Sequence, residues 1–259
     1  MDGQMTFWDH LDVLRASLIR VVVAGVVMGV GAFCLKDALF RLVLWPRSAD
    51  FPTYRWMGAA PFELRLVNTE LTEQFMIHMK VAFVAGLLVA SPYIIYVLFR
   101  FVQPALYAHE RRYTVRLLGA SYGMFLFGVA VNYLLVFPLT VRFLGTYSVS
   151  ADVETLLTLS SYVDTLLAMS VVFGILFELP VVAWLLARFG LLRAAWMTRY
   201  RRHAIVAILV VAAIVTPTAD VMTLLVVSLP IWLLYELSIC IVRFTNPTRA
   251  KHINIHRYA

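Results

Sequence analysis

Only one charged residue, Glu178, interrupts a long uncharged stretch that runs from Thr165 to Ala187. A helix of about 20 predominantly apolar residues crosses the hydrocarbon core of a bilayer, so this stretch is long enough to span a membrane. An ionisable side chain at that depth costs roughly 2.5–3.5 kcal/mol on insertion scales unless it is protonated or paired. Folding does not require such a residue, which favours a functional role for Glu178. The alternative is a neutral carboxyl that is hydrogen-bonded to a neighbouring helix and holds the bundle together.

The composition excludes a soluble globular domain. Hydrophobic residues make up 62% of the 259 residues and charged residues 14%, and the mean hydropathy is +0.83. The two cysteines, Cys34 and Cys240, both lie in apolar segments and offer no disulfide framework or metal-binding spacing. Acids stand among the first residues and no small-residue cleavage site follows them, so the first hydrophobic segment is expected to be retained.

The hydrophobic pattern predicts an all-α membrane protein with six transmembrane helices in a single integral membrane domain, residues 1–259. The last apolar region is divided at residues 216–220, because proline and aspartate there favour a turn. The resulting fifth helix has about a dozen strongly apolar residues, or roughly 18 Å, so the bilayer must thin beside it or flanking residues must snorkel. The predicted spans are Leu18–Leu35, Phe75–Phe99, Leu117–Pro138, Tyr162–Leu186, Ala204–Val215 and Val221–Val242.

The basic residues predict the orientation of these spans. Fifteen Lys and Arg residues would lie on the side of the N-terminus and six on the other side, five of those six in one long loop, 36–74. Cytoplasmic loops carry the excess of Lys and Arg, so both ends of the chain are expected inside, with 246–259 as a basic cytoplasmic tail. These charges also fit anionic lipid headgroups, and no basic stretch stands apart from a membrane flank to favour nucleic acid.

The inner loop between the second and third spans places Glu110 directly before Arg111 and Arg112. One interpretation is a solvated helix start, where an acid is favoured by the helix dipole. The other is a carboxylate presented to a guanidinium of a partner, since arginine and carboxylate form specific bidentate pairs. The loop by itself does not decide between them.

The segment from His10 to Arg15 has leucines at helical spacing, which predicts an amphipathic helix at the inner surface before the first span. His10 and Asp12 are more often residues of a solvated face than ligands. Two residues after Glu178, Pro180 frees a backbone carbonyl and is expected to bend its helix.

No zinc-binding H-E-x-x-H pair, G-x-S-x-G elbow or glycine-rich phosphate loop occurs in the sequence. We therefore expect neither an enzyme nor a cofactor.

Five segments together resemble one family, TatC, the multispanning receptor subunit of the twin-arginine protein translocase. They occur in the family's order between about residues 5 and 243. The segments are His10–Arg15, Pro104–Arg112, Phe177–Pro180, Thr216–Asp220, and Leu229-Pro230 with Tyr235-Glu236.

The resemblance implies a cupped six-helix bundle, N-in and C-in, in the bacterial cytoplasmic (inner) membrane. It implies recognition of the paired arginines in signal peptides of folded export substrates, self-association, and partnership with single-span TatA- and TatB-like subunits, with export driven by the proton motive force. Glu110 matches the family's loop acid for signal-peptide binding, and Glu178 with Pro180 matches the intramembrane partner site. Arg15, Pro104 and Arg111 match positions around the same cytoplasmic surface.

One position departs from the family pattern, in which the N-terminal motif commonly reads H-L-x-E-L-R. Val13 stands here in place of the acid, and the neighbouring acid is Asp12. A shift of one residue rotates a helical side chain by about 100°. Glu110 is therefore expected to carry more of the recognition.

Two other functions remain open on the sequence. A proton-coupled secondary transporter of a small solute would use Glu178 and Lys80 as a relay. A passive assembly scaffold would use neither Glu110 nor Glu178.

Overall fold

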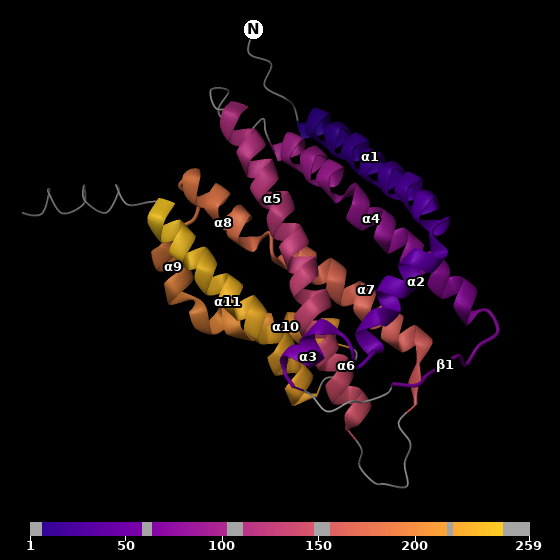
Figure 1. The fold of residues 1–259 in the computed structure, drawn as a ribbon. Helices are drawn as coiled ribbons and strands as arrows, with labels where there is room; N and C mark the ends of the chain where they lie inside the picture. The colour runs from indigo at the N-terminus through magenta and orange to yellow at the C-terminus, as the bar shows by residue number, and fades with distance from the viewer. Residues whose placement is uncertain (1–6, 59–63, 103–110, 148–155, 217–219, 246–259) are drawn as a thin grey trace, which may run out of the picture.

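The computed structural model describes residues 7–58, 64–102, 111–147, 156–216 and 220–245, and these residues are mostly helical (Figure 1). The elements in chain order are α1 (Phe7–Phe33), α2 (Lys36–Leu44), the 3₁₀ turn η1 (Trp45–Arg47), α3 (Pro52–Trp56), β1 (Leu66–Val67), α4 (Glu73–Val102), α5 (Arg111–Val131), the π-helical turn η3 (Asn132–Val136), α6 (Phe137–Thr146), β2 (Leu157–Thr158), α7 (Leu159–Leu176), α8 (Leu179–Arg188), α9 (Ala194–Arg199), α10 (Arg201–Val215) and α11 (Val221–Thr245).

Five helical runs in the described part of the chain are long and apolar enough to cross a membrane. They are Leu11–Phe33, Glu73–Arg100, Leu117–Thr146, Leu159–Arg188 and Val221–Thr245. Each overlaps one of the predicted spans, so a multi-pass helical membrane protein is confirmed. The remaining predicted segment, 204–215, lies within α10, whose 15 residues reach about 22 Å and fall short of a hydrocarbon core of about 30 Å.

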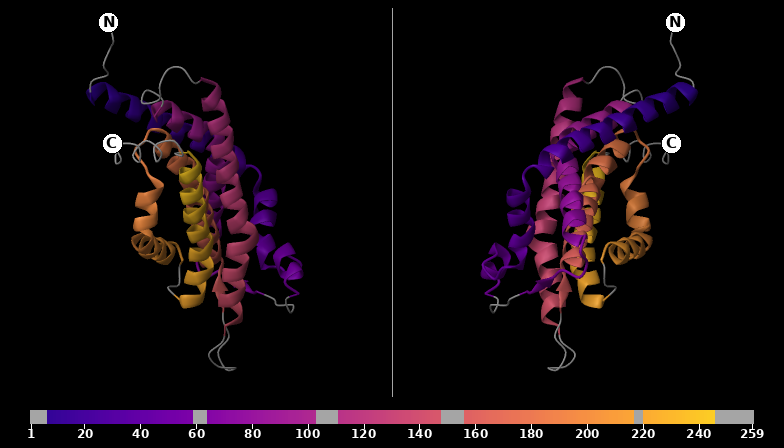
Figure 2. Two further views of the ribbon diagram at one scale, coloured as in Figure 1. Left: turned by 90° about the vertical axis from the view of Figure 1, so that its left-hand side faces the viewer. Right: turned by 90° about the vertical axis from the view of Figure 1, so that its right-hand side faces the viewer.

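The helix ends fall into two sets at opposite ends of the bundle (Figures 1 and 2). At the end drawn uppermost, called the upper end from here on, α1 begins, α4 ends, α5 begins and α11 ends. The opposite end, called the lower end, carries α3, α6 and the short β1–β2 pair. That pair is parallel and joins Leu66 to Leu157, which ties the α1–α4 connection to the start of α7.

The N-terminal segment corrects one prediction. Helix α1 runs without a break from Phe7 to Phe33, so residues 10–15 form the first turns of the first span and not a separate surface helix. The physical reason is that no glycine or proline stands between His10 and Arg20, and the apolar residues continue at a spacing that one helix can use.

Helices α1 and α4 pack at very close range through glycines. A Cβ built on Gly86 would lie 2.3 Å from the backbone nitrogen of Gly29, a separation that atoms cannot adopt. Small residues let helix backbones approach in this way inside a membrane. The buried ring of His78 completes the contact at the far end of α1, stacked on Phe33 with its Nε2 3.1 Å from the Phe33 carbonyl oxygen.

Buried tyrosine hydroxyls fasten the α2–α3 segment to the lower end of the bundle. Tyr54 donates to the carbonyl oxygens of Pro46 and Pro138 at 2.9 and 3.0 Å, and Tyr162 donates to that of Val43 at 3.0 Å. Burial raises the pKa of Tyr54 far above its ordinary value, so this hydroxyl stays protonated and remains a donor. The connection between the first two spans is therefore a structured cap.

We predict that Gly86→Ala lowers the thermal unfolding midpoint of the protein in detergent, because the added methyl forces α1 away from α4. Overpacking of this kind costs about 1–3 kcal/mol. The matched control is Gly123→Ala, since a Cβ at Gly123 would meet no atom within 4 Å. Both changes gain about 1 kcal/mol of intrinsic helix propensity. Equal midpoints for the two variants would contradict the close contact.

Candidate functional site

Glu178 lies at an interruption between two helices. Helix α7 ends at Leu176 and α8 begins at Leu179, with Pro180 in its first turn. Proline has no backbone N–H, so the ladder of hydrogen bonds cannot continue through this point. The N–H of Glu178 instead donates to the carbonyl of Ile175 at 3.1 Å. The bend predicted from Pro180 corresponds to this break, and the break displaces the carboxylate from a regular helical position.

The two oxygens of the Glu178 carboxyl have different surroundings. The hydroxyl of Ser121, which is 1% exposed on α5, donates a hydrogen bond to Oε2. Oε1 is buried and has no hydrogen-bond partner among the residues that the structure describes. If Glu178 only held the bundle together, its carboxyl would be hydrogen-bonded to a neighbouring helix. Among the described residues, such a bond is present for only one of its two oxygens.

Exposed apolar side chains lie directly beside Glu178. Ile175, Leu179 and Val182 are 60%, 40% and 45% exposed, and with Glu178 they follow the spacing of one helical face. Glu178 itself is partly exposed. Two other buried polar atoms also lack a partner in the described part of the chain, but their residues, Asn132 and Thr140, are completely enclosed. Of these three residues, Glu178 alone is partly exposed, although its Oε1 atom is buried.

The site is nearer the upper end of the bundle than the lower end. Glu178 stands ten residues before the end of α8 at Arg188, and Ser121 ten residues after the start of α5 at Arg111. Both counts place the site about 15 Å from the upper end, at 1.5 Å per residue. Toward the lower end the distance is greater: the start of α7 at Leu159 is 19 residues, or about 28 Å, from Glu178.

Glycines and a buried polar pair lock α5 against α7 around this site. A Cβ on Gly128 would lie 2.6 Å from the carbonyl oxygen of Phe173, and one on Gly174 would lie 2.6 Å from the ring of Phe125. Farther along the interface, Asn132 donates to the hydroxyl of Ser170 at 2.9 Å. The Ser121–Glu178 contact therefore forms between two helices that cannot shift freely against each other.

The structure does not bring Lys80 and Glu178 together, although the transporter alternative uses them as one relay. Lys80 forms an ion pair with Asp164 at 2.8 Å, and both side chains are about half exposed. Asp164 precedes Glu178 by 14 residues, which corresponds to about 21 Å along the α7–α8 run. Lys80 thus has its own partner at another depth.

Two ion pairs were not foreseen from the sequence, Lys80–Asp164 and the pair between Arg201 and Glu236 at 2.6 Å. The available signal was the presence of opposite charges within or beside apolar segments. Ser121 carried no signal of its own, since a serine in a span is common and usually bonds to its own helix.

The remaining described residues with a predicted role lie at the upper end. Asp12, Val13 and Arg15 are exposed in the first turns of α1. Arg111 begins α5. Glu110 and Pro104 lie outside the described residues, and nothing tests their predicted roles.

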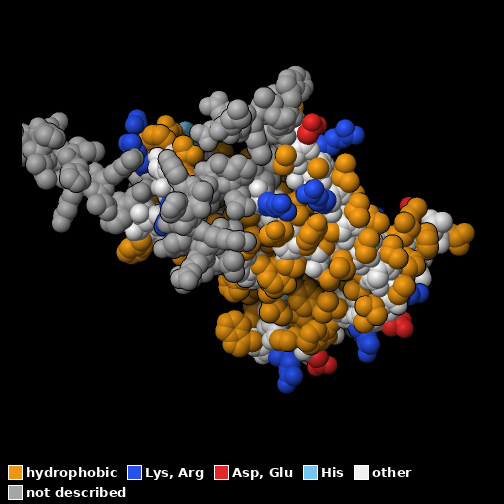
Figure 3. Space-filling view, turned by 90° about the horizontal axis from the view of Figure 1, so that it is seen from above, with side chains coloured by type: hydrophobic (Ala, Val, Ile, Leu, Met, Phe, Trp, Pro, Cys, Tyr) orange, Lys and Arg blue, Asp and Glu red, His pale blue; other side chains and the backbone are white. Residues whose placement is uncertain are grey.

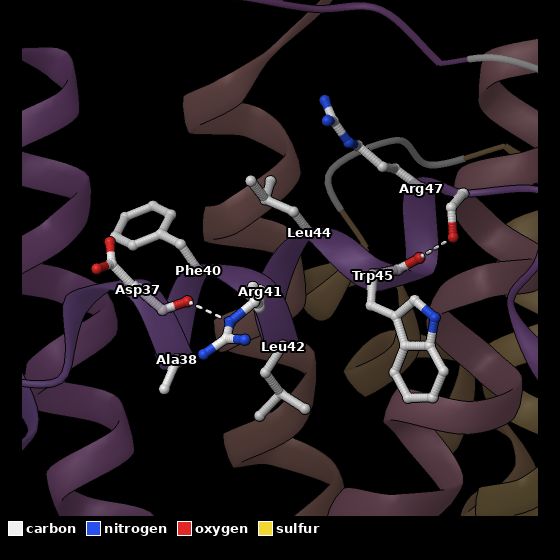
Figure 4. A pocket seen from close by; sticks show the side chains of 9 residues that line it. Asp37, Ala38, Phe40, Arg41, Leu42, Leu44, Trp45 and Arg47 are labelled. Carbon is white, nitrogen blue, oxygen red and sulfur yellow. Dashed lines mark hydrogen bonds between the residues drawn. The ribbon is translucent and has the colours of Figure 1, made fainter.

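A hollow of about 910 Å³ lies elsewhere, on α2 and η1 (Figure 4). The hollow lies along α2 and the turn that follows it. Within it, Arg41 donates to the carbonyl oxygen of Asp37 at 3.3 Å, and the side chains of Trp45 and Arg47 point in different directions. This hollow contains none of the residues around Glu178 and does not extend that site.

The chain matches proteins of known family over nearly its whole length. Residues 9–230 match the family model described as Sec-independent protein translocase protein (TatC). The chain belongs to the TatC family. The TatC protein of Koribacter versatilis is 35% identical over 248 residues, which cover 94% of this chain and 87% of that protein. The TatC protein of Deinococcus radiodurans is 35% identical over 242 residues, covering 91% and 85%.

Solved structures agree with this assignment. A crystal structure described as the twin-arginine translocase receptor TatC superposes with a TM-score of 0.79 at 32% identity, and the match covers 91% of this chain and 99% of that one. A second, determined in the detergent DDM, gives a TM-score of 0.77. As a TatC protein, the chain is a multi-pass membrane component of the Sec-independent, twin-arginine translocase. Its role is transport rather than catalysis.

We predict that Lys80→Gln and Asp164→Asn each lower the unfolding midpoint and that the double variant recovers most of the loss, because each single change leaves an uncompensated charge. The coupling should be about 1 kcal/mol or less, since both side chains are half exposed. The measurement is a double-mutant cycle on the purified protein together with export of a twin-arginine substrate in cells. Normal export by the double variant would agree with a structural pair. A complete loss of export at normal protein abundance would instead support a relay.

Proposed function

We propose that this chain is the receptor of a bacterial twin-arginine export system. It binds the paired-arginine signal peptides of folded precursors at the cytoplasmic face and assembles with single-span TatA- and TatB-like subunits, and with further copies of itself, to move the precursors across the inner membrane. The observation that carries the proposal is TatC family membership over nearly the full chain, combined with a carboxyl of which one oxygen has no hydrogen-bond partner among the described residues.

The proposed topology has six spans in one membrane domain, with both ends in the cytoplasm and α10 as the short fifth span. The upper end is assigned to the cytoplasmic side because α1 begins there and α11 ends there, with Arg15 in the first turns of α1 and Arg243 in the last turn of α11. Seen from above, Lys and Arg side chains stand out from a surface that is otherwise mostly hydrophobic (Figure 3). Residues 246–259 are proposed to form a basic tail on the same side.

The signal-peptide site is proposed to join the start of α1 to the connection between α4 and α5. Glu110, Pro104 and Arg111 belong to that connection, and α4 ends and α5 begins at the upper end. Asp12 and Arg15 are exposed in the first turns of α1 at the same end. A carboxylate here can form a charge-assisted, bidentate pair with a guanidinium of the signal peptide. Lysine cannot form that planar pair.

The subunit-binding site is proposed to lie at Glu178 and Pro180. Oε1 of Glu178 needs a partner, and the adjacent Ile175, Leu179 and Val182 offer an apolar surface to a second helix. A polar group on a single-span subunit would satisfy Oε1 while its apolar residues cover these side chains. Interhelical hydrogen bonds in membranes contribute about 1–2 kcal/mol in model helices.

The test of receptor function is photo-crosslinking of a twin-arginine signal peptide to this chain in native membranes. We predict that Glu110→Gln lowers the crosslink yield about tenfold. The change removes one charge-assisted hydrogen bond, and a loss of about 1.5 kcal/mol corresponds to a factor of about ten. Asp12→Asn should have a smaller effect. Replacing the two signal arginines by lysines should abolish the contact.

Asp50→Asn is the matched control, since it neutralises an exposed acid of the loop between α1 and α4, in the half of the molecule opposite the start of α1. A crosslink that is insensitive both to the two arginines and to Glu110 would contradict the receptor proposal. Uptake of a small solute by the purified chain alone would support the transporter instead.

The short helix α10 is proposed to thin the bilayer beside the translocation path, because about 22 Å of helix must adapt to a core of about 30 Å. We predict that four leucines inserted into α10 reduce export at least several-fold at normal protein abundance. The control is an insertion of four Gly and Ser residues into the connection 148–155, which a loop tolerates at little cost. Unchanged export by the lengthened protein would refute the thinning role.

A further inference from the structure

The hydroxyl of Ser121 decides which Glu178 oxygen is available. Ser121 is the described donor to Oε2, so that oxygen is occupied within the subunit, and Oε1 keeps its full hydrogen-bonding capacity. While the Ser121 hydroxyl donates to Oε2, Oε1 is the oxygen left without a described partner. It is an acceptor when the carboxyl is ionised, and a donor when it carries the proton of the neutral carboxyl.

The contact with Ser121 also orders the Glu178 side chain. The residue stands between α7 and α8, at the N-cap of α8. A glutamate side chain that must be ordered loses up to about 1.5–2 kcal/mol of rotamer entropy. A fixed donor on a neighbouring helix removes much of that cost before a partner arrives, which is preorganisation.

Ser121 is itself held rigidly enough to act as that donor. Gly128 and Gly174 bring α5 and α7 into direct contact on the side of Glu178 toward the lower end. The rings of Phe127 and Phe177 pack edge to face with centroids 5.6 Å apart. These contacts lie beside the hydrogen bond on the side of the lower end and hold α5 against α7 there.

We propose that Ser121 is a positioning residue that preorganises Glu178 for the subunit partner, by binding Oε2 and directing Oε1 toward the apolar face of Ile175, Leu179 and Val182. This inference rests on the proposed role of Glu178 in subunit binding. It adds that the binding strength depends on a residue of α5, a helix other than those that flank Glu178.

The test uses the full chain in phospholipid vesicles with a single-span TatA-like subunit from the same organism. A photoreactive residue at position 182 reports association as crosslink yield against subunit concentration. Ser121→Ala should weaken association roughly threefold to thirtyfold, the range for an interhelical hydrogen bond in a membrane. Ser121→Cys should fall between Ala and Ser, because the thiol is a weaker donor in nearly the same volume.

Ser238→Ala is the matched control. Ser238 is also 1% exposed, but its hydroxyl donates at 2.8 Å to the Leu234 carbonyl of its own helix, α11. Its removal should leave association unchanged. In a Glu178→Ala background, Ser121→Ala should have no further effect, because the hydroxyl acts only through the carboxyl.

Each other result has a distinct meaning. An equal loss from Ser121→Ala with and without Glu178 would assign Ser121 to packing and overturn the inference. A normal association of Ser121→Ala, beside a weakened Glu178→Ala, would also overturn it while leaving the partner role of Glu178 intact. A Glu178→Ala variant that associates normally would overturn the proposed subunit site, and the positioning role with it.

Discussion

Hydrocarbon offers no hydrogen bonds to a buried polar atom, and this constraint governs how the helices of this chain meet. Three polar pairs link neighbouring helices: Ser121 with Glu178, Asn132 with Ser170, and Lys80 with Asp164. Each pair restricts the rotation of two helices at once. The pairing is incomplete at Oε1 of Glu178, which has no hydrogen-bond partner among the described residues, and the exposed side chains of Ile175, Leu179 and Val182 lie next to this residue in the chain.

The site depends on two backbone features. Pro180 ends the regular hydrogen bonding of α7 and places Glu178 in a turn, while glycines bring α5 close enough for Ser121 to reach it. A side chain at Gly128 or Gly174 would separate the two helices and break the contact. The hydrogen bond between Ser121 and Glu178 thus depends on a proline and two glycines, none of which has a polar side chain.

The two ends of the bundle are built for different purposes. The lower end is a cap in which buried tyrosines hold backbone carbonyls from segments far apart in the sequence. The upper end gathers the start of α1, the end of α4, the start of α5 and the end of α11. A stiff cap at the lower end holds these helices in fixed positions relative to one another.

The sequence alone determined the properties that depend on neighbours along the chain. Hydropathy located the apolar helices, and Pro217 with Asp220 predicted the boundary between the last two, where α10 ends at Val215 and α11 begins at Val221. The lone charge at Glu178 and the bend near Pro180 were equally visible. Only the tertiary structure decided that Asp164 pairs with Lys80 and that Ser121 holds Glu178. Those contacts join residues 84 and 57 positions apart, and they follow from how closely the helices pack and at what rotation, which no local pattern specifies.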